Sequence, residues 1–306
     1  MLTKNNYLSI AISVLFFVVT FFSFNSSVYA YEKNDLTQLT KKGNCVKCDF
    51  SNYHFRSSQW DLSKNNLSRA NLHKANLQGL NLEKANFFSS DLTYSNLEKA
   101  SALRTNFQKA DLSYSNLKKA DFSKATFKDT TLIHSNLSYS KLLRTDFNHA
   151  DLSNVNFIQA VLNDANFSHA NLSSADLDLA DLSSKSKNHA TDFSYAELVK
   201  TQLINTKSQG VIFDHANLYQ ADFDGSDLTS ASFIKANLAE ANLSHVNLQN
   251  AVLKEANLVN VSLVYADLTG ADLSKANLQN ANLSGAILTN CNLKGAIMPD
   301  GSINNG

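Results

Sequence analysis

The sequence predicts an all-β solenoid in which five-residue units are wound four to a coil. A large apolar residue, Leu or Phe, recurs every five residues along most of the chain, as in the stretch ANFSHANLSSADLDLADL at 165–182. A small residue stands two positions before each of these centres, and Asn or Asp stands between the two. A period of five fits neither the 3.6 residues of a helix nor the 2.0 of a strand, whereas an exact short period is typical of a solenoid.

The phenylalanines indicate how many units make a coil. Residues that stack along a solenoid axis recur once per coil, and Phe recurs at the centre every twenty residues in each of two blocks: Phe87, Phe107, Phe127, Phe147 and Phe167, then Phe193, Phe213 and Phe233. A coil is therefore four units. Block 1, residues 62–182, holds 25 units, and block 2, residues 193–298, holds 22. With neighbouring strands about 4.8 Å apart, about 12 coils would make a rod of roughly 55–60 Å.

The repeat resembles that of the pentapeptide-repeat proteins, whose consensus is A-(D/N)-L-x-x, over 47 units of this chain. The resemblance implies a right-handed four-sided (quadrilateral) β-helix with the centre and the small residue pointing inward. A narrow bore explains the Ala, Ser and Thr at the small position, because overpacking a dense interior costs about 1–3 kcal/mol. The motif is specific for the fold but gives almost no information about function.

Residues 1–30 read as a signal peptide. Lys4 precedes an apolar stretch, Tyr7–Phe24, and Ser27-Val28-Tyr29-Ala30 offers a cleavage site after Ala30. The alternative is an uncleaved membrane anchor, because the 17 residues of Leu8–Phe24 just reach the lower limit for spanning. Either way the repeat domain is expected to leave the cytoplasm, and we expect a periplasmic or secreted protein.

Residues 31–61 are expected to form an N-terminal cap. Tyr31–Gly43 predicts a short helix that covers the edges of the first coil, with Asp35 as N-cap and Gly43 as C′. Trp60 stands where a small residue is usual, and we expect it to plug the open end of the bore.

The cap contains a C-x-x-C motif with two interpretations. Cys45 and Cys48 could be a redox dithiol or half of a zinc site, but no strand-then-helix pattern and no second Cys or His pair accompanies them. Both fall in the inward phase of the repeat, and in an oxidising compartment we expect them to form a structural disulfide. The resemblance supports this, since similar chains often begin with a Cys-pair cap. Cys291, at a small-residue position, reads as a buried substitute for Ala.

Residues 183–192 interrupt the array. Phe193 follows Phe167 by 26 residues, one coil of twenty plus six, so Ser183–Ala190 is expected to bulge outward and keep the two blocks in phase. The alternative is a one-residue slip that rotates block 2 by one side. The weak unit Thr206–Gly210 suggests a second small loop. The polar tail, residues 299–306, is too short to be a helical cap, so we expect an open terminal coil that can pair with another copy as a homodimer.

The outward position two residues after each centre carries ladders spaced by twenty. The first ladder is basic. The second ladder includes Tyr, and we expect it to lie on a neighbouring face of the rod. The third ladder, on another face, includes Arg69, Lys109, His149 and His169. The functional interpretation is that these rows form a binding surface for an anionic polymer or a protein. The simpler interpretation is that they are solvated turn residues. The candidate partner-binding residues are Lys64, Lys84, Arg104, Lys124, Arg144, Tyr94 and Tyr114. His149 and His169 lack the carboxylate or thiolate neighbours that a metal site needs.

The chain shows no catalytic signature. It has no nucleophile elbow, phosphate loop or metal-ligand cluster, so we expect no enzyme, no cofactor and no small-molecule substrate. Its 27 basic and 27 acidic residues argue against a strong field for nucleic acid or membrane. The leading prediction is an exported, non-enzymatic scaffold that binds a protein or an anionic polymer. The alternatives are a structural spacer of the cell envelope and, by resemblance, a DNA mimic acting on a type II topoisomerase, which requires an acidic cytoplasmic rod.

Overall fold

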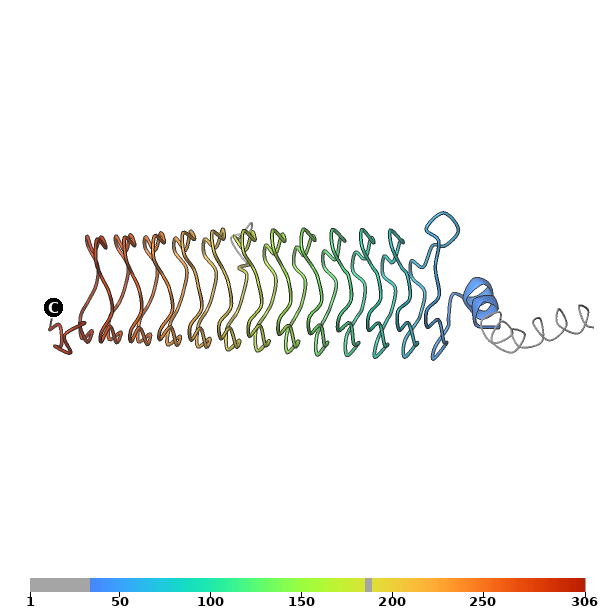
Figure 1. The fold of residues 1–306 in the computed structure, drawn as a ribbon, viewed down its shortest axis with the longest axis horizontal. Helices are drawn as coiled ribbons and strands as arrows, with labels where there is room; N and C mark the ends of the chain where they lie inside the picture. The colour runs from blue at the N-terminus through green and yellow to red at the C-terminus, as the bar shows by residue number, and fades with distance from the viewer. Residues whose placement is uncertain (1–33, 185–188, 306) are drawn as a thin grey trace, which may run out of the picture.

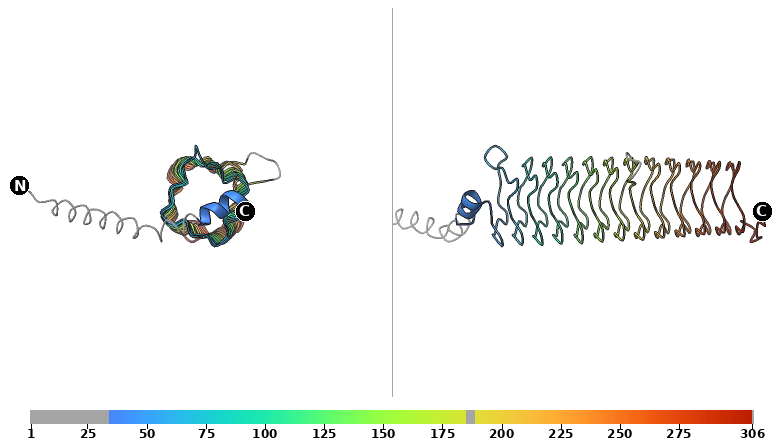
Figure 2. Two further views of the ribbon diagram at one scale, coloured as in Figure 1. Left: turned by 90° about the vertical axis from the view of Figure 1, so that its right-hand side faces the viewer. Right: turned by 180° about the vertical axis from the view of Figure 1, so that it is seen from behind.

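The computed structural model describes residues 34–184 and 189–305, which form a short helix followed by a long rod (Figure 1). The helix spans residues 34–42, and the rod is built from isolated parallel bridges rather than extended strands. Each unit contributes its Asn/Asp position to the ladder, and partners are twenty residues apart, as in Asn86↔Asn106 and Asn106↔Thr126. Four units thus complete one coil, and the end-on view shows a roughly square cross-section (Figure 2).

Backbone hydrogen bonds join each unit to the coils on both sides. The Phe87 N–H donates to the Asn106 carbonyl (2.7 Å), and the Ser89 N–H donates to Gln108 (3.0 Å). The Asn106 N–H reaches back to Ala85 (2.9 Å). Because each unit uses three donors in this way, a proline inside the array would remove a ladder bond. The single proline of the chain, Pro299, follows the last unit.

The bore is filled by the centres and the small residues, as the repeat predicts. The centres from Leu62 to Leu278 are buried, and those of the Phe series stack ring on ring. Phe107 and Phe127, for example, have centroids 4.8 Å apart and planes 6° apart. Parallel stacking follows from the twenty-residue repeat, which places identical side chains at the same point of successive coils.

The two blocks remain in phase across the interruption. Asn166 pairs with Asp192 and Asp181 with Lys207, each 26 residues apart, and the usual spacing of twenty then resumes. Phe167 stacks on Phe193 with centroids 4.6 Å apart and planes 1° apart. The register and the ring contact confirm the in-phase insertion predicted from the spacing, and they contradict a rotation by one side.

The inserted segment is shorter than the predicted segment Ser183–Ala190. The Ser184 N–H donates to the Gln209 carbonyl (3.3 Å), and the Thr191 hydroxyl donates to Leu182 (2.6 Å), so both residues keep regular places in the repeat. The six added residues are therefore 185–190. Of these, 185–188 lie outside the described residues, so the shape of the predicted bulge is not described.

The predicted second loop at Thr206–Gly210 is wrong. Lys207 pairs with Asp227 at the regular spacing of twenty, and Ser208 is fully buried at a centre position. Its hydroxyl lies 2.8 Å from the Thr206 hydroxyl, which also donates to Ser226 of the next coil (3.0 Å). A polar centre is tolerated here because a buried hydroxyl with a partner avoids the desolvation penalty.

The N-terminal helix lies across the end of the bore (Figure 2). Leu39 is buried, and the helix ends at Gly43, whose φ is +58° and whose N–H donates to Leu39 (2.9 Å), as predicted for C′. The N-cap prediction for Asp35 is wrong: this residue lies inside the helix, and its carboxylate accepts the Asp49 N–H (2.9 Å). Asp35 therefore ties the helix to the C-x-x-C segment.

The first coil is two residues longer than the others. Asn44 pairs with Asn66 and His54 with Asn76, each at a spacing of 22, and the longer turn protrudes at the N-terminal end of the rod (Figure 1). Trp60 follows this turn and packs edge-on against Phe55, with centroids 5.4 Å apart. It is part of an aromatic cluster with Phe50 and Tyr53 in the first coil.

The C-terminal coil is incompletely covered. Ile303 pairs antiparallel with Ile297, and the Gly295 N–H donates to Asn304 (2.7 Å), so residues after the last unit fold back over one side. Leu283 and Leu288 are only partly buried there. Cys291 is also partly exposed, which corrects the prediction that it is buried like the Ala it replaces.

Buried hydroxyls at the small position allow a matched stability test. The Thr105 hydroxyl donates to the Leu82 carbonyl of the previous coil (2.6 Å), whereas the buried Ser135 hydroxyl has no partner. Thr105→Ala should therefore lower the free energy of unfolding by about 1–2 kcal/mol, from the lost hydrogen bond and the lost buried methyl group, and Ser135→Ala should leave it unchanged or raise it by about 1 kcal/mol. Urea unfolding measures both. An equal loss in the two variants would contradict the assignment.

Candidate functional site

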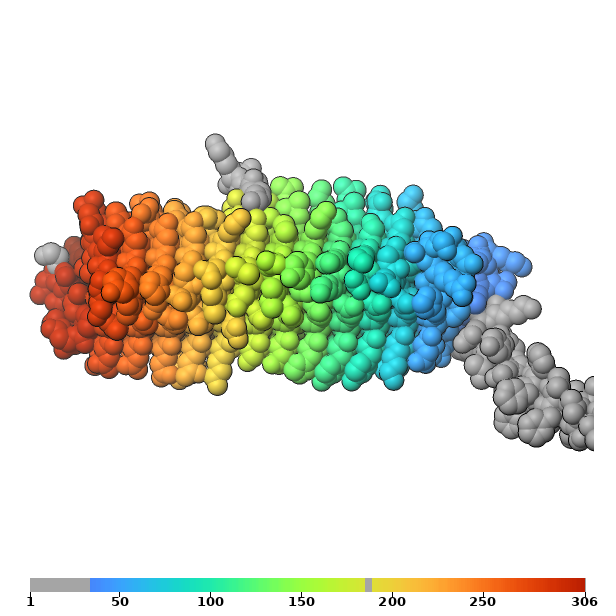
Figure 3. All heavy atoms as spheres, turned by 45° about the horizontal axis from the view of Figure 1, so that its top comes forward, coloured from blue at the N-terminus to red at the C-terminus, as the bar shows by residue number. Residues whose placement is uncertain are grey.

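The outward side chains that could bind a partner stand at the corners of the coils. Nearly every non-glycine residue two positions after a centre has a φ of 54–61°, in the left-handed region that usually favours Gly or Asn. Lys, Arg, Tyr and His tolerate it here because the corner N–H bonds to the next coil, as Arg104 does to Ser123 (3.1 Å). The side chains of successive coils consequently align in rows along the rod (Figure 3).

The first row is the Lys64 ladder, defined as Lys64, Lys84, Arg104, Lys124 and Arg144. Lys84 pairs with the neighbouring Glu83 (2.8 Å), and together with the field of the ladder this salt bridge lowers the pKa of that carboxyl. Arg144 lies 3.4 Å from the buried carboxylate of Asp164. Within the described part of the chain the other three side chains form no salt bridge.

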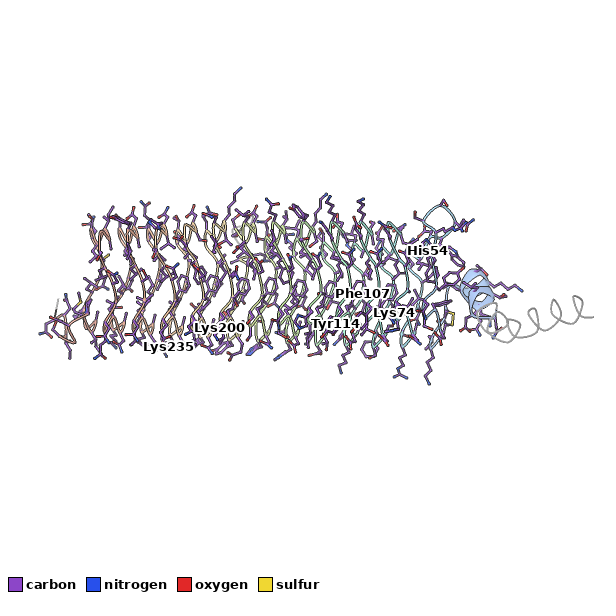
Figure 4. All side chains as sticks on the ribbon, viewed as in Figure 1. His54, Lys74, Phe107, Tyr114, Lys200 and Lys235 are labelled. Atoms are coloured by element: carbon purple, nitrogen blue, oxygen red, sulfur yellow. A yellow bond between two sulfur atoms is a disulfide. The ribbon has the colours of Figure 1, made fainter. Side chains whose placement is uncertain are left out.

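The second row is the Tyr94 ladder, defined as Lys74, Tyr94, Tyr114 and His134. Lys74 and Tyr114 point out from one side of the rod (Figure 4). The ring centroids of Tyr94 and Tyr114 are 5.0 Å apart with planes 6° apart, and the Lys74 ammonium lies 6.0 Å from the centre of the Tyr94 ring.

The two ladders do not form one surface. Lys64 and Lys74 are ten residues apart, which is half of a twenty-residue coil, so the rows lie on opposite sides of the rod. The prediction that they occupy neighbouring faces is wrong. The seven candidate residues therefore fall on two separate surfaces, five cations on one and two tyrosines on the other.

The tyrosines do not offer a platform on which the bases of a nucleic acid could stack. One face of each ring lies against the other tyrosine, with centroids 5.0 Å apart and no space for a third ring between them. The second face of Tyr114 stacks on His134 with centroids 5.1 Å apart, and the Lys74 ammonium lies near Tyr94. Only edges and hydroxyl groups are exposed, with Tyr94 52% and Tyr114 50% exposed. Intercalated stacking of bases on this row is thus excluded without breaking the stack.

A third row crosses the interruption. The His149 ladder consists of His149, His169, Tyr195 and His215, whose rings are stacked with centroids 4.9, 5.1 and 4.7 Å apart. The sequence analysis identified the first two members, and a further step of twenty leads to His189, which falls within the interruption. The 26-residue spacing that fits the Phe series would have given Tyr195 instead. Among the described residues, no group of three or more His, Cys, Asp or Glu side chains could hold a metal ion.

The position of the cysteine pair indicates a structural role. Cys45 and Cys48 are joined by a disulfide, with Cα atoms 5.4 Å apart, and their exposed fractions are 0% and 4%. The bond closes the turn between the helix and the first coil. Sulfur atoms buried this deeply are not accessible to a redox partner.

Thiol counting tests this assignment. Unreduced, denatured protein should show one free thiol, from Cys291, and three would reject the bond. In the native protein Cys291 should react with a disulfide reagent near pH 8 more slowly than in the denatured protein. The reason is that partial burial raises the pKa of its thiol and lowers the thiolate fraction. Equal rates in the two states would contradict the burial argument.

A shallow polar hollow of about 280 Å³ lies beside the long first turn. It is lined by His54, Phe55, Arg56, Ser57, Ser58, Asn76 and Gln78. It lies in the first coil, whose bridges are spaced by 22 residues instead of twenty, and most of its lining residues are exposed. The repeat pattern does not predict this hollow, because it depends on the two added residues of that coil.

The repeats match two descriptions of known families. Residues 66–101, 103–138, 145–183 and 209–241 match pentapeptide repeats (8 copies), and residues 226–298 match the pentapeptide repeat region. The chain belongs to the pentapeptide-repeat family. Proteins of this family fold as right-handed quadrilateral β-helices and are non-enzymatic repeat scaffolds. No helix in the described part of this family member is long and apolar enough to cross a membrane.

Solved pentapeptide-repeat structures are similar to this chain. HetL from the cyanobacterium Nostoc sp. strain PCC 7120, involved in heterocyst differentiation regulation, is 28% identical over 85% of this chain and 91% of its own, with a TM-score of 0.31. Rfr23 from Cyanothece 51142 is 27% identical over 47% and 90%, with a TM-score of 0.30. QnrB1, a plasmid-mediated fluoroquinolone resistance protein, is 15% identical over 79% and 92%, with a TM-score of 0.28. No curated protein matches the chain.

Proposed function

We propose that this protein is an exported, non-enzymatic scaffold whose rod presents its outer side chains to a protein or an anionic polymer. One observation carries the proposal. Inward positions are filled almost entirely by Leu, Phe, Ala and other small residues, whereas most corners of block 1 carry Lys, Arg, Tyr or His in rows along the axis. A rod of about 12 coils, closed at one end by the helix, would hold these rows at fixed spacing without ordering cost on binding.

Two features support export. Residues 1–30 have the charge and hydropathy pattern of a signal peptide, although they lie outside the described residues. The Cys45–Cys48 disulfide fits an oxidising compartment, since cytosolic thiols are kept reduced. Contact with a membrane is proposed only if the first 30 residues stay attached, and no cofactor or small-molecule substrate is part of the proposal.

Export and partner binding are tested together in the native host. Fractionation followed by mass spectrometry of the N-terminus should find the chain outside the cytoplasm, beginning at Tyr31. Cross-linking in the same compartment, from a photoreactive residue at Lys124 or at Tyr114, should then join the rod to a reproducible partner. Retention of the full chain in the cytoplasm would overturn the proposal. Export with no cross-linked partner from either position would favour the spacer alternative.

The topoisomerase alternative fits the charges of only part of this chain. A DNA mimic needs a rod that is acidic along its length, but residues 34–144 hold 17 basic and 9 acidic residues, and the acidic excess is confined to residues 145–306, with 17 acidic and 8 basic ones. Supercoiling assays with a purified type II topoisomerase test it directly, and we expect no effect of the protein on the reaction. Nucleic acid is likewise not proposed as a partner.

A further inference from the structure

The overall charge balance conceals a separation of charge along the rod. Residues 34–144 hold 17 basic and 9 acidic residues, whereas residues 145–306 hold 8 basic and 17 acidic ones. The sign changes where Arg144 lies against Asp164. Charges separated by more than about 8–10 Å are largely screened at physiological salt. A ligand bound at one half of the rod therefore interacts with the charge of that half, although the net charge of the chain is zero.

One side of the N-terminal half concentrates the positive charge. Residues 64–69, 84–89, 104–109 and 124–129 stack in four successive coils, and we name the outward side chains of these segments the basic side. It holds one carboxylate, Asp129, and seven cations: Lys64, Arg69, Lys84, Arg104, Lys109, Lys124 and Lys128. A second carboxylate, Glu83, borders the basic side at the same corner as Lys84 and pairs with it (2.8 Å). The Lys64 ladder forms one edge, and the other edge carries Arg69 and Lys109.

The middle of the basic side is polar, with its hydrogen-bonding groups largely paired. The Asn86 side chain donates to Asn66 (3.1 Å), and the Asn106 side chain donates to Asn86 (2.9 Å). Gln108 donates to Asp129 (3.4 Å). Phe88 is the one outward-facing aromatic side chain in these segments, because Phe87, Phe107 and Phe127 are buried in the bore, and Phe88 itself is half-buried. What the side offers a ligand is therefore mainly charge, repeated once per coil.

This chemistry fits a linear polyanion better than the other macromolecules. A protein interface usually centres on buried aromatic anchors, and single-stranded nucleic acid is held by free ring faces, neither of which this side provides. Cations repeated about every 4.8 Å along the axis suit a chain with an anionic group on successive sugar units. We propose that the basic side binds an acidic polysaccharide lying along the rod, which rests on the proposed function of an exported scaffold.

Two matched variants test the proposal. Lys64→Gln/Arg104→Gln/Lys124→Gln removes three cations from the basic side. Lys74→Gln/Lys99→Gln/Lys119→Gln removes three from the other corners of the same half. All six are exposed corner residues with φ of 56–60°, so both variants lose the same charge from equivalent backbone. Circular dichroism and thermal melting should show both to be folded.

The measurement is fluorescence anisotropy with an end-labelled heparin dodecasaccharide at a series of salt concentrations. We expect the basic-side variant to bind at least tenfold more weakly at 0.15 M salt than the natural sequence, with a shallower dependence on salt, and the control variant to lose less than threefold. Release of counterions is the physical reason, because each lost contact removes its share of the slope.

Three results would overturn the inference: equal losses in the two variants, tighter binding of a thymidine 12-mer than of the polysaccharide, or no binding by the natural sequence. The proposed function fails separately. If the protein is exported and cross-links to a partner but does not bind heparin, the scaffold proposal stands and the basic side has another role. If it stays in the cytoplasm, the scaffold proposal fails whatever heparin does.

Discussion

Replacing Leu137 by Ala in the middle of the rod is expected to lower the free energy of unfolding by about 2–5 kcal/mol. Leu137 is fully buried, and its N–H is fixed to the Asn156 carbonyl (2.7 Å). The bore cannot collapse around the missing atoms, because the backbone on each side is held by the coils above and below. The cavity should therefore persist, which places the cost toward the upper part of that range.

Urea unfolding followed by circular dichroism measures this loss. Lys124→Ala is the control, because it changes an exposed corner residue and should stay within about 0.5 kcal/mol of the natural sequence. A loss below 1 kcal/mol for Leu137→Ala would mean that the centre residues are not tightly packed, and it would contradict the account of the bore.

Deleting residues 185–190 is expected to leave the rod intact. Ser184 and Thr191 already hold regular corner and small positions, so joining them directly would restore the twenty-residue spacing between Phe167 and Phe193. Deleting five or seven residues from the same place should instead prevent stable folding of block 2. Each shifts the chain by one position and turns inward residues outward through 22 units.

Thermal melting of the three deletion variants distinguishes an in-phase insertion from a rotation of block 2 by one side. The six-residue deletion should melt within a few degrees of the natural sequence, and the other two should melt far lower or not fold. If all three deletions melt at similarly low temperatures, the in-phase insertion is wrong, and block 2 is rotated by one side relative to block 1.

The fold could be predicted from the sequence because every unit carries its own inward phase and Phe reveals the coil length. Predictions failed where contacts outside the five-residue pattern decide the outcome. Ser208 looked like a loop residue, but its hydroxyl is paired within the bore with Thr206, which in turn bonds to Ser226 of the next coil. Asp35 looked like an N-cap, but it binds Asp49, fourteen residues away. Cys291 looked like a buried Ala, but its coil has too little above it.

The candidate surface was harder to predict than the fold. The rows themselves follow from the period of twenty, but their arrangement around the rod requires counting corners, and ten residues correspond to the opposite side. Stacking of the tyrosine rings depends on rotamers that no sequence pattern specifies. The balanced total charge also misled, because the two signs are separated along the axis and the concentration of cations on one side appears only when coils are stacked.

A cysteine pair across the interruption tests most directly whether the rod is continuous. Ser168 and Ser194 occupy equivalent positions in adjacent coils, where the His169 N–H donates to the Ser194 carbonyl (3.0 Å). With Cys291 changed to Ala, Ser168→Cys/Ser194→Cys should form a disulfide under mild oxidation, since neighbouring coils lie about 4.8 Å apart. Ser173→Cys/Ser194→Cys, which a rotation by one side would bring together, should remain reduced. The opposite result, a bond in the second pair and none in the first, would contradict the continuous rod.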